Sequence, residues 1–399
     1  MNRKLDLVYF DAGGGHRNAA RALKQAIEDQ GRTWDVRLVQ LQRLLDPLDP
    51  VRKWTGVRLE DVYNSMLKGG WTLGAPHMKR LLHLAIRSSH AAQLGLMRRY
   101  WRNTRPDLVV SLVPHFNRSL FQSLRALQPY TPYVTVLTDL ADYPPHFWIE
   151  HQAQHFICGS RRAFQQAVEQ AHPLSRVWRV SGMIVHPRFY YPAADRAAGR
   201  MRLGLDPDLP TGLVMFGGQG SMTMLRIAAR MNALAGRVQL IMLCGRHEEL
   251  AAQLRAMRGG VRMHVEGFTT AVPEFMDLAD FFIGKPGPGS LSEALLKGLP
   301  VIVERNLYTL PQERYNADWV RQHELGLAIR SFAHVDRAVE RLLAPARFQR
   351  YRQHAAAMRN RAVFEVVDIL STLLGDQPTH QPNAQLAAAP LQRSLTTAG

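Results

Sequence analysis

The sequence has few cysteines and no long apolar run. Its 399 residues include two cysteines, Cys158 and Cys244, and neither has the C-x-x-C spacing of a metal site. We expect both to be buried free thiols in a reducing compartment. No run approaches the roughly 20 apolar residues that a spanning helix needs, and "MNRKLDLVYF" is too short for the apolar core of a signal peptide. These absences predict a cytoplasmic protein.

Acidic residues are scarce relative to basic ones. The chain has 50 Lys and Arg against 33 Asp and Glu, so its formal net charge is +17 at pH 7. Such a charge favours an anionic partner: nucleic acid, an anionic membrane surface or a phosphorylated small molecule. The sequence has no RRM signature and no zinc-finger spacing, so we do not expect it to bind nucleic acid.

Short apolar runs alternate with helical patterns, which is typical of parallel α/β sheets. Residues 186–212, rich in proline, glycine and charge, divide the runs into two sets. We therefore predict an α/β fold with two Rossmann-like, doubly wound domains, 1–190 and 200–344, that face each other across a cleft. The expected strands are 5–10, 34–41, 107–113, 133–138, 155–158 and 177–182, then 212–217, 238–244, 262–267, 280–284 and 299–303.

The remaining C-terminal residues divide into a helix and a tail. One helix is expected at about 345–374, and it could pack back on the first domain. The tail 377–399 is biased toward proline, glutamine and alanine, so we expect it to be disordered.

The first glycine turn, "DAGGGHRNAARA" (11–22), follows one expected strand and precedes a helix. It lacks the Gly-Lys-Ser/Thr of a P-loop, and Asn18 stands where the last glycine of a dinucleotide fingerprint belongs. Gly14 and Gly15 let the backbone approach a ligand closely. What remains is a turn that presents His16, which is either a general base at the cleft or a residue that only caps the turn.

Two further glycine turns lie in the second half. "FGGQGSM" (216–222) presents Gly218, Gln219 and Ser221, and the first two turns together can clamp a diphosphate. In the third turn, "GKPGPGSLSEALL" (284–296), we expect a helix capped at Gly289 or Ser290.

Glu293 lies one turn into that helix. Its carboxylate can accept two hydrogen bonds from a ribose diol while backbone N–H groups, from Gly287 onward, hold phosphates. The alternative is that the helix dipole alone favours an acid there.

Three segments together resemble a known family: "GKPGPGSLSEALLKGLPVIV", "GFTTAVPEFMDLADFFI" and "DAGGGHRNAARAL". The family is that of the monogalactosyldiacylglycerol synthases and their bacterial processive glycolipid relatives, which are GT-B glycosyltransferases. "TVLTDL", "FICGSRRA", "VMFGGQGSM" and "LCGRHEEL" follow in family order, so the resemblance spans about residues 5–330.

The resemblance implies an inverting transfer of a hexose, galactose or glucose, from a UDP-sugar to a lipid hydroxyl, normally diacylglycerol, at a membrane surface. It gives His16 the role of the catalytic histidine and Asp139 that of an acid near the acceptor. Glu293 would bind the ribose, and Phe268 would lie beside the uracil. Gln312 and Glu313 would touch the donor sugar.

The sequence departs from the family pattern at two positions. Pro311 stands where relatives carry glycine, and Pro144 stands where they carry histidine, with His146 nearby but not aligned. No Asp-x-Asp occurs at a strand end, and helix N-termini can stabilise the departing UDP. We therefore expect no cofactor and no obligatory metal.

Residues 52–105 hold eleven Lys and Arg residues with Trp54, Trp71 and Trp101, against two acids. Helices of this composition can lie in the headgroup layer, which predicts a protein peripherally attached to the inner face of the cell membrane. The alternative is a solvated basic face. For the whole chain, the open alternatives are N-acetylglucosaminyl transfer to a lipid-linked precursor, a non-hydrolysing epimerase and a non-catalytic UDP-sugar-binding protein.

Overall fold

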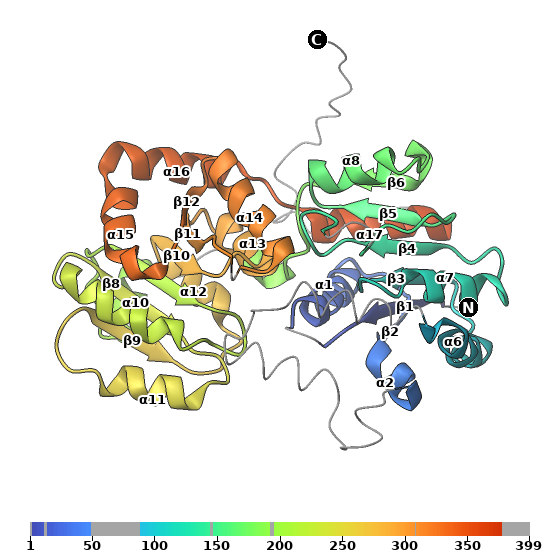
Figure 1. Cartoon of the computed structure of the whole chain (residues 1–399), viewed down its shortest axis with the longest axis horizontal. Coiled ribbons are helices and arrows are strands. Elements are labelled where there is room, and N and C mark those ends of the chain that lie inside the picture. The colour runs from blue at the N-terminus through green and yellow to red at the C-terminus, as the bar shows by residue number, and fades with distance from the viewer. Residues whose placement is uncertain are drawn as a thin grey trace, which may run out of the picture.

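The computed structural model describes residues 2–11, 14–48, 88–143, 147–191, 195–307 and 309–376. They form two parallel six-stranded sheets, each flanked by helices, which lie side by side in Figure 1. The predicted α/β class with two doubly wound domains is confirmed. The tail 377–399 lies outside the described residues.

The first sheet has the strand order β2-β1-β3-β4-β5-β6. Its strands are β1 Lys4–Tyr9, β2 Asp35–Gln40, β3 Leu108–Ser111, β4 Tyr133–Val136, β5 His155–Cys158 and β6 Val177–Arg179. Its helices are α1 Gly15–Asp29, α2 Leu41–Leu45, α6 His90–Thr104, α7 Asn117–Arg125 and α8 Arg161–Glu169. Short 3₁₀ turns occur at η1 Asp46–Leu48, η2 Leu174–Arg176 and η3 Pro187–Tyr190.

The second sheet has the order β12-β11-β10-β7-β8-β9. Its strands are β7 Thr211–Met215, β8 Gln239–Leu243, β9 Arg262–Glu266, β10 Phe281–Gly284, β11 Val301–Glu304 and β12 Gly326–Ile329. Its helices are α9 Arg196–Arg202, α10 Thr223–Met231, α11 Glu248–Ala256, α12 Val272–Leu278, α13 Pro288–Leu296, α14 Pro311–Gln322, α15 Val335–Leu343 and α16 Pro345–Ala357, with 3₁₀ turns η4 Asn232–Leu234 and η5 Phe332–His334. β12 was not predicted from the sequence, because its four residues "GLAI" contain only one β-branched side chain.

Both faces of each sheet are buried, as parallel sheets require. In β7 and β8, neighbouring residues alternate between two apolar clusters: Val214 and Leu240 face one, and Leu213 and Ile241 face the other. This double burial explains why the strands read as continuous apolar runs in the sequence.

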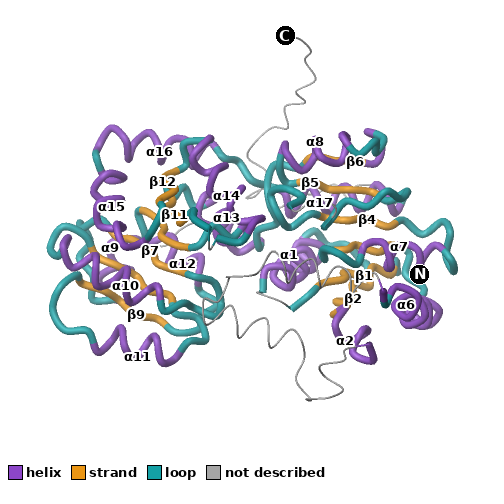
Figure 2. Tube along the Cα trace, viewed as in Figure 1, coloured by secondary structure: helices purple, strands orange, loops and turns teal. Residues whose placement is uncertain are grey.

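The expected single helix at 345–374 is wrong, because two helices occupy those residues. α16 packs on α13 and α15, whereas α17 (Ala362–Leu374) packs on α1 in the first domain (Figure 2). Asn360 separates them: its side chain accepts the Ala362 N–H and donates to the Met183 carbonyl. The chain thus crosses from the second domain to the first at this residue.

The strand orders place a topological switch point in each sheet. In the first sheet the chain runs outward from the boundary between β1 and β3, and in the second from the boundary between β7 and β10. In open parallel sheets, ligands bind outside the carboxyl ends of the strands at this boundary. Any shared site is therefore expected where the turns after β1, β3, β7 and β10 lie.

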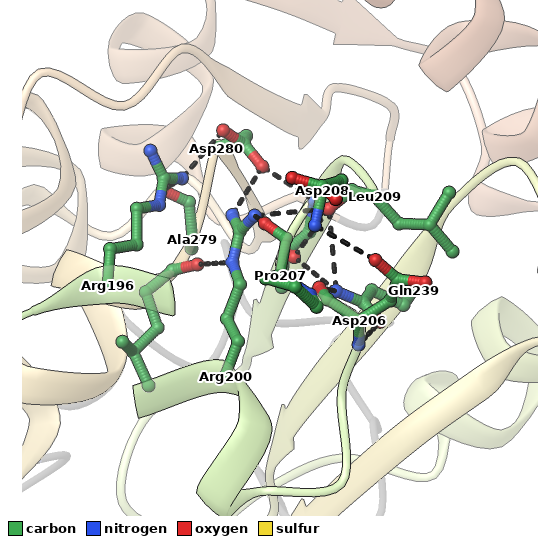
Figure 3. Close-up of polar contacts among 11 residues, drawn as sticks. Arg196, Arg200, Asp206, Pro207, Asp208, Leu209, Gln239, Ala279 and Asp280 are labelled. Carbon is green, nitrogen blue, oxygen red and sulfur yellow. Dashed lines mark hydrogen bonds and ion pairs between the residues drawn. The ribbon is translucent and has the colours of Figure 1, made fainter. Parts of the chain in front are cut away.

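The opposite, amino edge of the second sheet carries a structural ion-pair network (Figure 3). Arg196 and Arg200, both on α9, each bind one carboxylate oxygen of Asp280 at 2.6 Å. Asp280 also accepts the Thr211 N–H at 2.7 Å, and Arg200 donates to the Leu278 carbonyl at 2.9 Å. Part of the excess positive charge therefore ties α9 to the sheet.

Among the helices that the structure describes, none is long and apolar enough to cross a membrane.

Candidate functional site

His16 lies at the first switch point. Gly14 precedes α1 with a φ of 81°, a conformation that side chains disfavour, and this turn places His16 just inside the helix. Its Nδ1 is 2.9 Å from Thr138 Oγ1, and the ring also hydrogen-bonds the backbone of Leu112, directly after β3. Burial lowers the pKa of His16 to about 4, against the opposing effect of Leu112. The imidazole is therefore neutral at pH 7, as a general base must be.

An ion pair closes the glycine turn that carries His16. Arg17 Nη1, on α1, lies 2.6 Å from Asp11 Oδ1, so the pair brackets the turn from both sides. The two charges fix the start of α1 relative to the end of β1.

Asp139 and His16 are linked through Trp148. The Trp148 indole donates to Asp139 Oδ2 at 3.0 Å, and its ring lies 5.8 Å from the His16 ring. Asp142 is fully buried and accepts the backbone N–H groups of Phe147 and Trp148, each at 2.9 Å. Sequence reasoning missed Trp148 and the role of Asp142, because both depend on how the loop after β4 folds back. Pro144 and His146 lie outside the described residues.

The turns after β7 and β8 meet so closely that two positions have no room for a side chain. A Cβ on Gly220, whose φ is +65°, would lie 2.4 Å from the Cys244 carbonyl oxygen, and one on Gly245 would lie 2.5 Å from that of Gly218. Gly218 itself is exposed, and the carbonyl oxygen of Gln219's side chain is buried without a hydrogen-bond partner among the described residues. Ser221 accepts the Thr223 N–H at the start of α10.

The helix after β10 begins earlier than the sequence predicted. The expected cap at Gly289 or Ser290 is wrong: α13 starts at Pro288 and Gly287 is its N-cap. Proline suits the first helical position because it lacks an N–H there and its φ is already helical. Gly289 and Ser290 thus lie in the first turn, and Glu293 lies beyond it. The first-turn dipole alternative for Glu293 therefore loses its basis.

Among the described residues, the Glu293 carboxylate has no hydrogen-bond donor. Burial raises its pKa to about 7, and the charge of Arg188 only partly opposes this. A ligand that supplies hydroxyl donors would satisfy the carboxylate.

Helix α14 holds the donor-side turns together. Pro311 takes the first helical position, so the departure from glycine is compatible with the fold. Gln312 and Glu313 follow in the first turn. The Glu313 carboxylate lies 3.7 Å from Lys285 Nζ, and Asn316 donates to the Pro286 carbonyl at 2.8 Å.

Phe268 lies beside an open cavity of about 600 Å³ at the carboxyl ends of β8 and β9. Phe268 is 56% exposed, and the Arg246 guanidinium lies over its ring at 4.5 Å from the ring centroid. The backbone N–H of Arg246, which lines this cavity, donates to the carbonyl of Gly218 in the turn after β7 at 2.9 Å. The lining residues are Gly245, Arg246, Glu248, Ala251, Arg255, Gly267 and Phe268.

The two carboxyl edges meet across the domain boundary. Tyr143, in the loop that carries Asp139, contacts Tyr315 on α14 with ring centroids 5.7 Å apart. The structure thus groups the predicted residues in two sets, each after the strands of its own sheet. Among the described residues, no group of three or more His, Cys, Asp or Glu side chains could hold a metal ion.

The basic segment 52–105 is described only from residue 88, so Trp54 and Trp71 lie outside the described residues. The interpretation of Trp101 as a headgroup residue is wrong. Trp101 is fully buried and its indole donates to Ser123 Oγ at 2.8 Å. Arg98, Arg99 and Arg102 are exposed on the same helix, α6.

Comparison with known proteins shows that the chain is similar to glycosyltransferases. Residues 212–372 match the Glycosyltransferase family 28 C-terminal domain. The chain is 29% identical to a probable chloroplastic monogalactosyldiacylglycerol synthase of Glycine max, over 93% of the chain and 72% of that protein. It is 28% identical to monogalactosyldiacylglycerol synthase 1 of Arabidopsis thaliana, over 93% and 71%.

Two solved structures illustrate the fold. The calicheamicin glycosyltransferase CalG4 matches with a TM-score of 0.60 at 16% identity, covering 94% of this chain and 98% of that one. A putative UDP-N-acetylglucosamine 2-epimerase from Listeria monocytogenes matches with a TM-score of 0.58 at 14% identity, covering 95% and 98%. The predicted GT-B fold is confirmed, and the fold alone is shared by transferases and epimerases.

Proposed function

We propose that the chain transfers a hexose from a UDP-hexose to a lipid hydroxyl of the diacylglycerol type, because residues 212–372 match the Glycosyltransferase family 28 C-terminal domain and the chain is similar to monogalactosyldiacylglycerol synthases. The observation that carries the proposal is that each switch point holds one group suited to the reaction. One is a neutral His16, and the other is Glu293, whose carboxylate has no donor among the described residues.

The proposed transfer is a single displacement with inversion. The lipid hydroxyl oxygen bonds to the anomeric carbon as the bond from that carbon to the β-phosphate oxygen breaks. His16 accepts the hydroxyl proton, and the electron pair of the broken bond leaves with UDP. Asp139 lies on the same side, joined to His16 through Trp148.

The donor would lie along the carboxyl edge of the second sheet. Phe268 would stack on the uracil beside its cavity, and Glu293 would accept hydrogen bonds from the ribose hydroxyls. Gln312 and Glu313 would contact the hexose. The first turns of α10 and α13 would stabilise the diphosphate charge, so we propose that no metal is obligatory.

The acceptor would be reached at an anionic membrane surface on the cytoplasmic side. Arg98, Arg99 and Arg102 form an exposed basic row on α6, and cations near anionic lipid each add about 1 kcal/mol of attraction. Replacing all three with serine should reduce binding to anionic vesicles and leave UDP affinity unchanged. If this variant and the parent bind vesicles equally well, the three arginines form only a solvent-exposed basic face and do not bind the membrane.

The proposal is tested by product analysis. The pure protein is incubated with labelled UDP-galactose, UDP-glucose or UDP-N-acetylglucosamine and vesicles that contain diacylglycerol, with and without EDTA. A hexosylated lipid formed in EDTA supports the proposal. An epimerised UDP-sugar without lipid product would identify an epimerase, and UDP-sugar binding without turnover would identify a binding protein.

A further inference from the structure

Lys285 is the first residue after β10, at the switch point of the second sheet. β10 and β7 are neighbours in register, Gly284 against Met215, so Lys285 and the turn after β7 emerge side by side. The close approaches agree: a Cβ on Gly217 would lie 3.8 Å from Lys285 Cε, and one on Gly287 would lie 3.6 Å from it. The side chain thus lies between two glycine turns.

The ammonium of Lys285 is incompletely paired. The structure gives it one acidic neighbour, Glu313, at 3.7 Å, beyond the range of a good hydrogen bond. An ammonium carries three donors, and this side chain is 39% exposed. By contrast, Lys297 at the far end of α13 binds Asp277 at 2.9 Å and is 9% exposed. Lys285 therefore has free donors between the two turns that we propose bind the diphosphate.

We propose that Lys285 binds the donor's diphosphate and exchanges its contact with Glu313 for the phosphate when the nucleotide enters. This inference rests on the proposed function. In the transfer step the bond from the anomeric carbon to the β-phosphate oxygen breaks, and the electron pair stays on that oxygen. Lys285 stabilises the resulting charge by a charge-assisted hydrogen bond. Release from Lys285 frees Glu313 to contact the hexose.

The exchange predicts that Lys285 recognises phosphate and not the nucleoside. Lys285→Met should weaken UDP binding by roughly 10- to 100-fold, the effect of one charge-assisted hydrogen bond, and should change uridine binding less than twofold. Glu313→Gln removes the competing carboxylate, so UDP should bind as tightly as in the parent or more tightly, while hexose transfer falls.

The experiment is calorimetry of UDP and of uridine with the parent, Lys285→Met, Lys285→Arg and a matched control, Lys24→Met. Lys24 is 38% exposed and pairs with Glu28 on α1, so its loss removes the same charge at the same exposure in the other domain. A drop in the UDP-to-uridine affinity ratio in Lys285→Met alone, partly restored by arginine, supports the proposal.

Two results would overturn it. If Lys285→Met loses affinity for UDP and uridine equally, Lys285 only shapes the turn. If it binds both as the parent does, the ammonium takes no part. A parent protein that binds neither ligand would instead contradict the proposed function, so the two failures are distinguishable.

Discussion

Acids and histidines have different surroundings at the amino and carboxyl edges of the parallel sheets. At the amino edge of the second sheet, Asp280 is bound by two arginines and a backbone N–H, whereas Glu293, after β10, has no donor among the described residues. In the first sheet, His16 follows β1 and His155 begins β5. Burial lowers the pKa of both to about 4, with Arg176 and Arg125 adding to the effect at His155. A shifted pKa alone therefore does not identify a candidate catalytic residue. The position of the residue at the carboxyl edge of the sheet is the better criterion.

The largest expected effect separates the two histidines. His16→Ala should reduce hexose transfer about 10²- to 10⁴-fold, because the acceptor proton loses its base, while UDP binding is kept. His155→Ala, which removes an equally shifted imidazole at the opposite edge, should keep parental turnover. Similar turnover in the two variants would contradict the assignment of the base to His16.

The second effect concerns stability at the amino edge. Asp280→Asn leaves Arg200, which is 4% exposed, without its counter-charge, and breaking such a buried pair costs about 3–5 kcal/mol. Denaturant unfolding should show this loss, whereas UDP affinity of the folded protein should stay as in the parent. A folded variant with parental stability and weakened UDP binding would contradict the assignment of Asp280 to structure.

The third effect, at Glu293, is the reverse of that at Asp280: UDP affinity should fall while stability is kept. Glu293→Gln should weaken UDP binding by about 1–3 kcal/mol, because a charged acceptor of the ribose hydroxyls is lost. The free energy of unfolding should not fall at pH 7, since the parent carboxylate has no donor to lose. Calorimetry and denaturant unfolding on the same preparation check both halves.

The smallest effect is a pH dependence. The pKa of Glu293 is raised to about 7, so uridine affinity should rise from pH 6 to pH 8 as the carboxylate ionises and can accept both hydroxyls. Uridine has no phosphate to titrate, which isolates the protein group. The same shift means that Glu293 adds stability below about pH 4.5, and that this contribution is lost as pH rises through 7. In Glu293→Gln the slope of uridine affinity should vanish.

Local patterns in the sequence were enough for the architecture. Parallel strands buried on both faces give apolar runs, and eleven of the twelve strands follow from them. β12 was missed because four residues with one β-branched side chain give too weak a pattern. The cap of α13 was misplaced because Pro288 serves as a first helical residue as well as a turn residue.

The positions of candidate residues in the fold could be predicted where a glycine turn precedes them. His16 and Glu293 stand next to glycine turns, so their placement after a strand could be inferred. Trp148, Asp142 and Lys285 owe their roles to partners distant in the sequence or on neighbouring strands, which no local pattern records. For Trp101 a signal existed: Met97, four residues earlier, is also fully buried, and this spacing indicates a core-facing stripe.

A crystal structure of the protein with bound UDP would show directly where the donor lies relative to the two carboxyl edges. We expect uracil against Phe268, the ribose hydroxyls within hydrogen-bond distance of Glu293, and the β-phosphate between the turns after β7 and β10. UDP bound away from these carboxyl ends, with the Glu293 carboxylate still lacking a donor, would contradict this expectation.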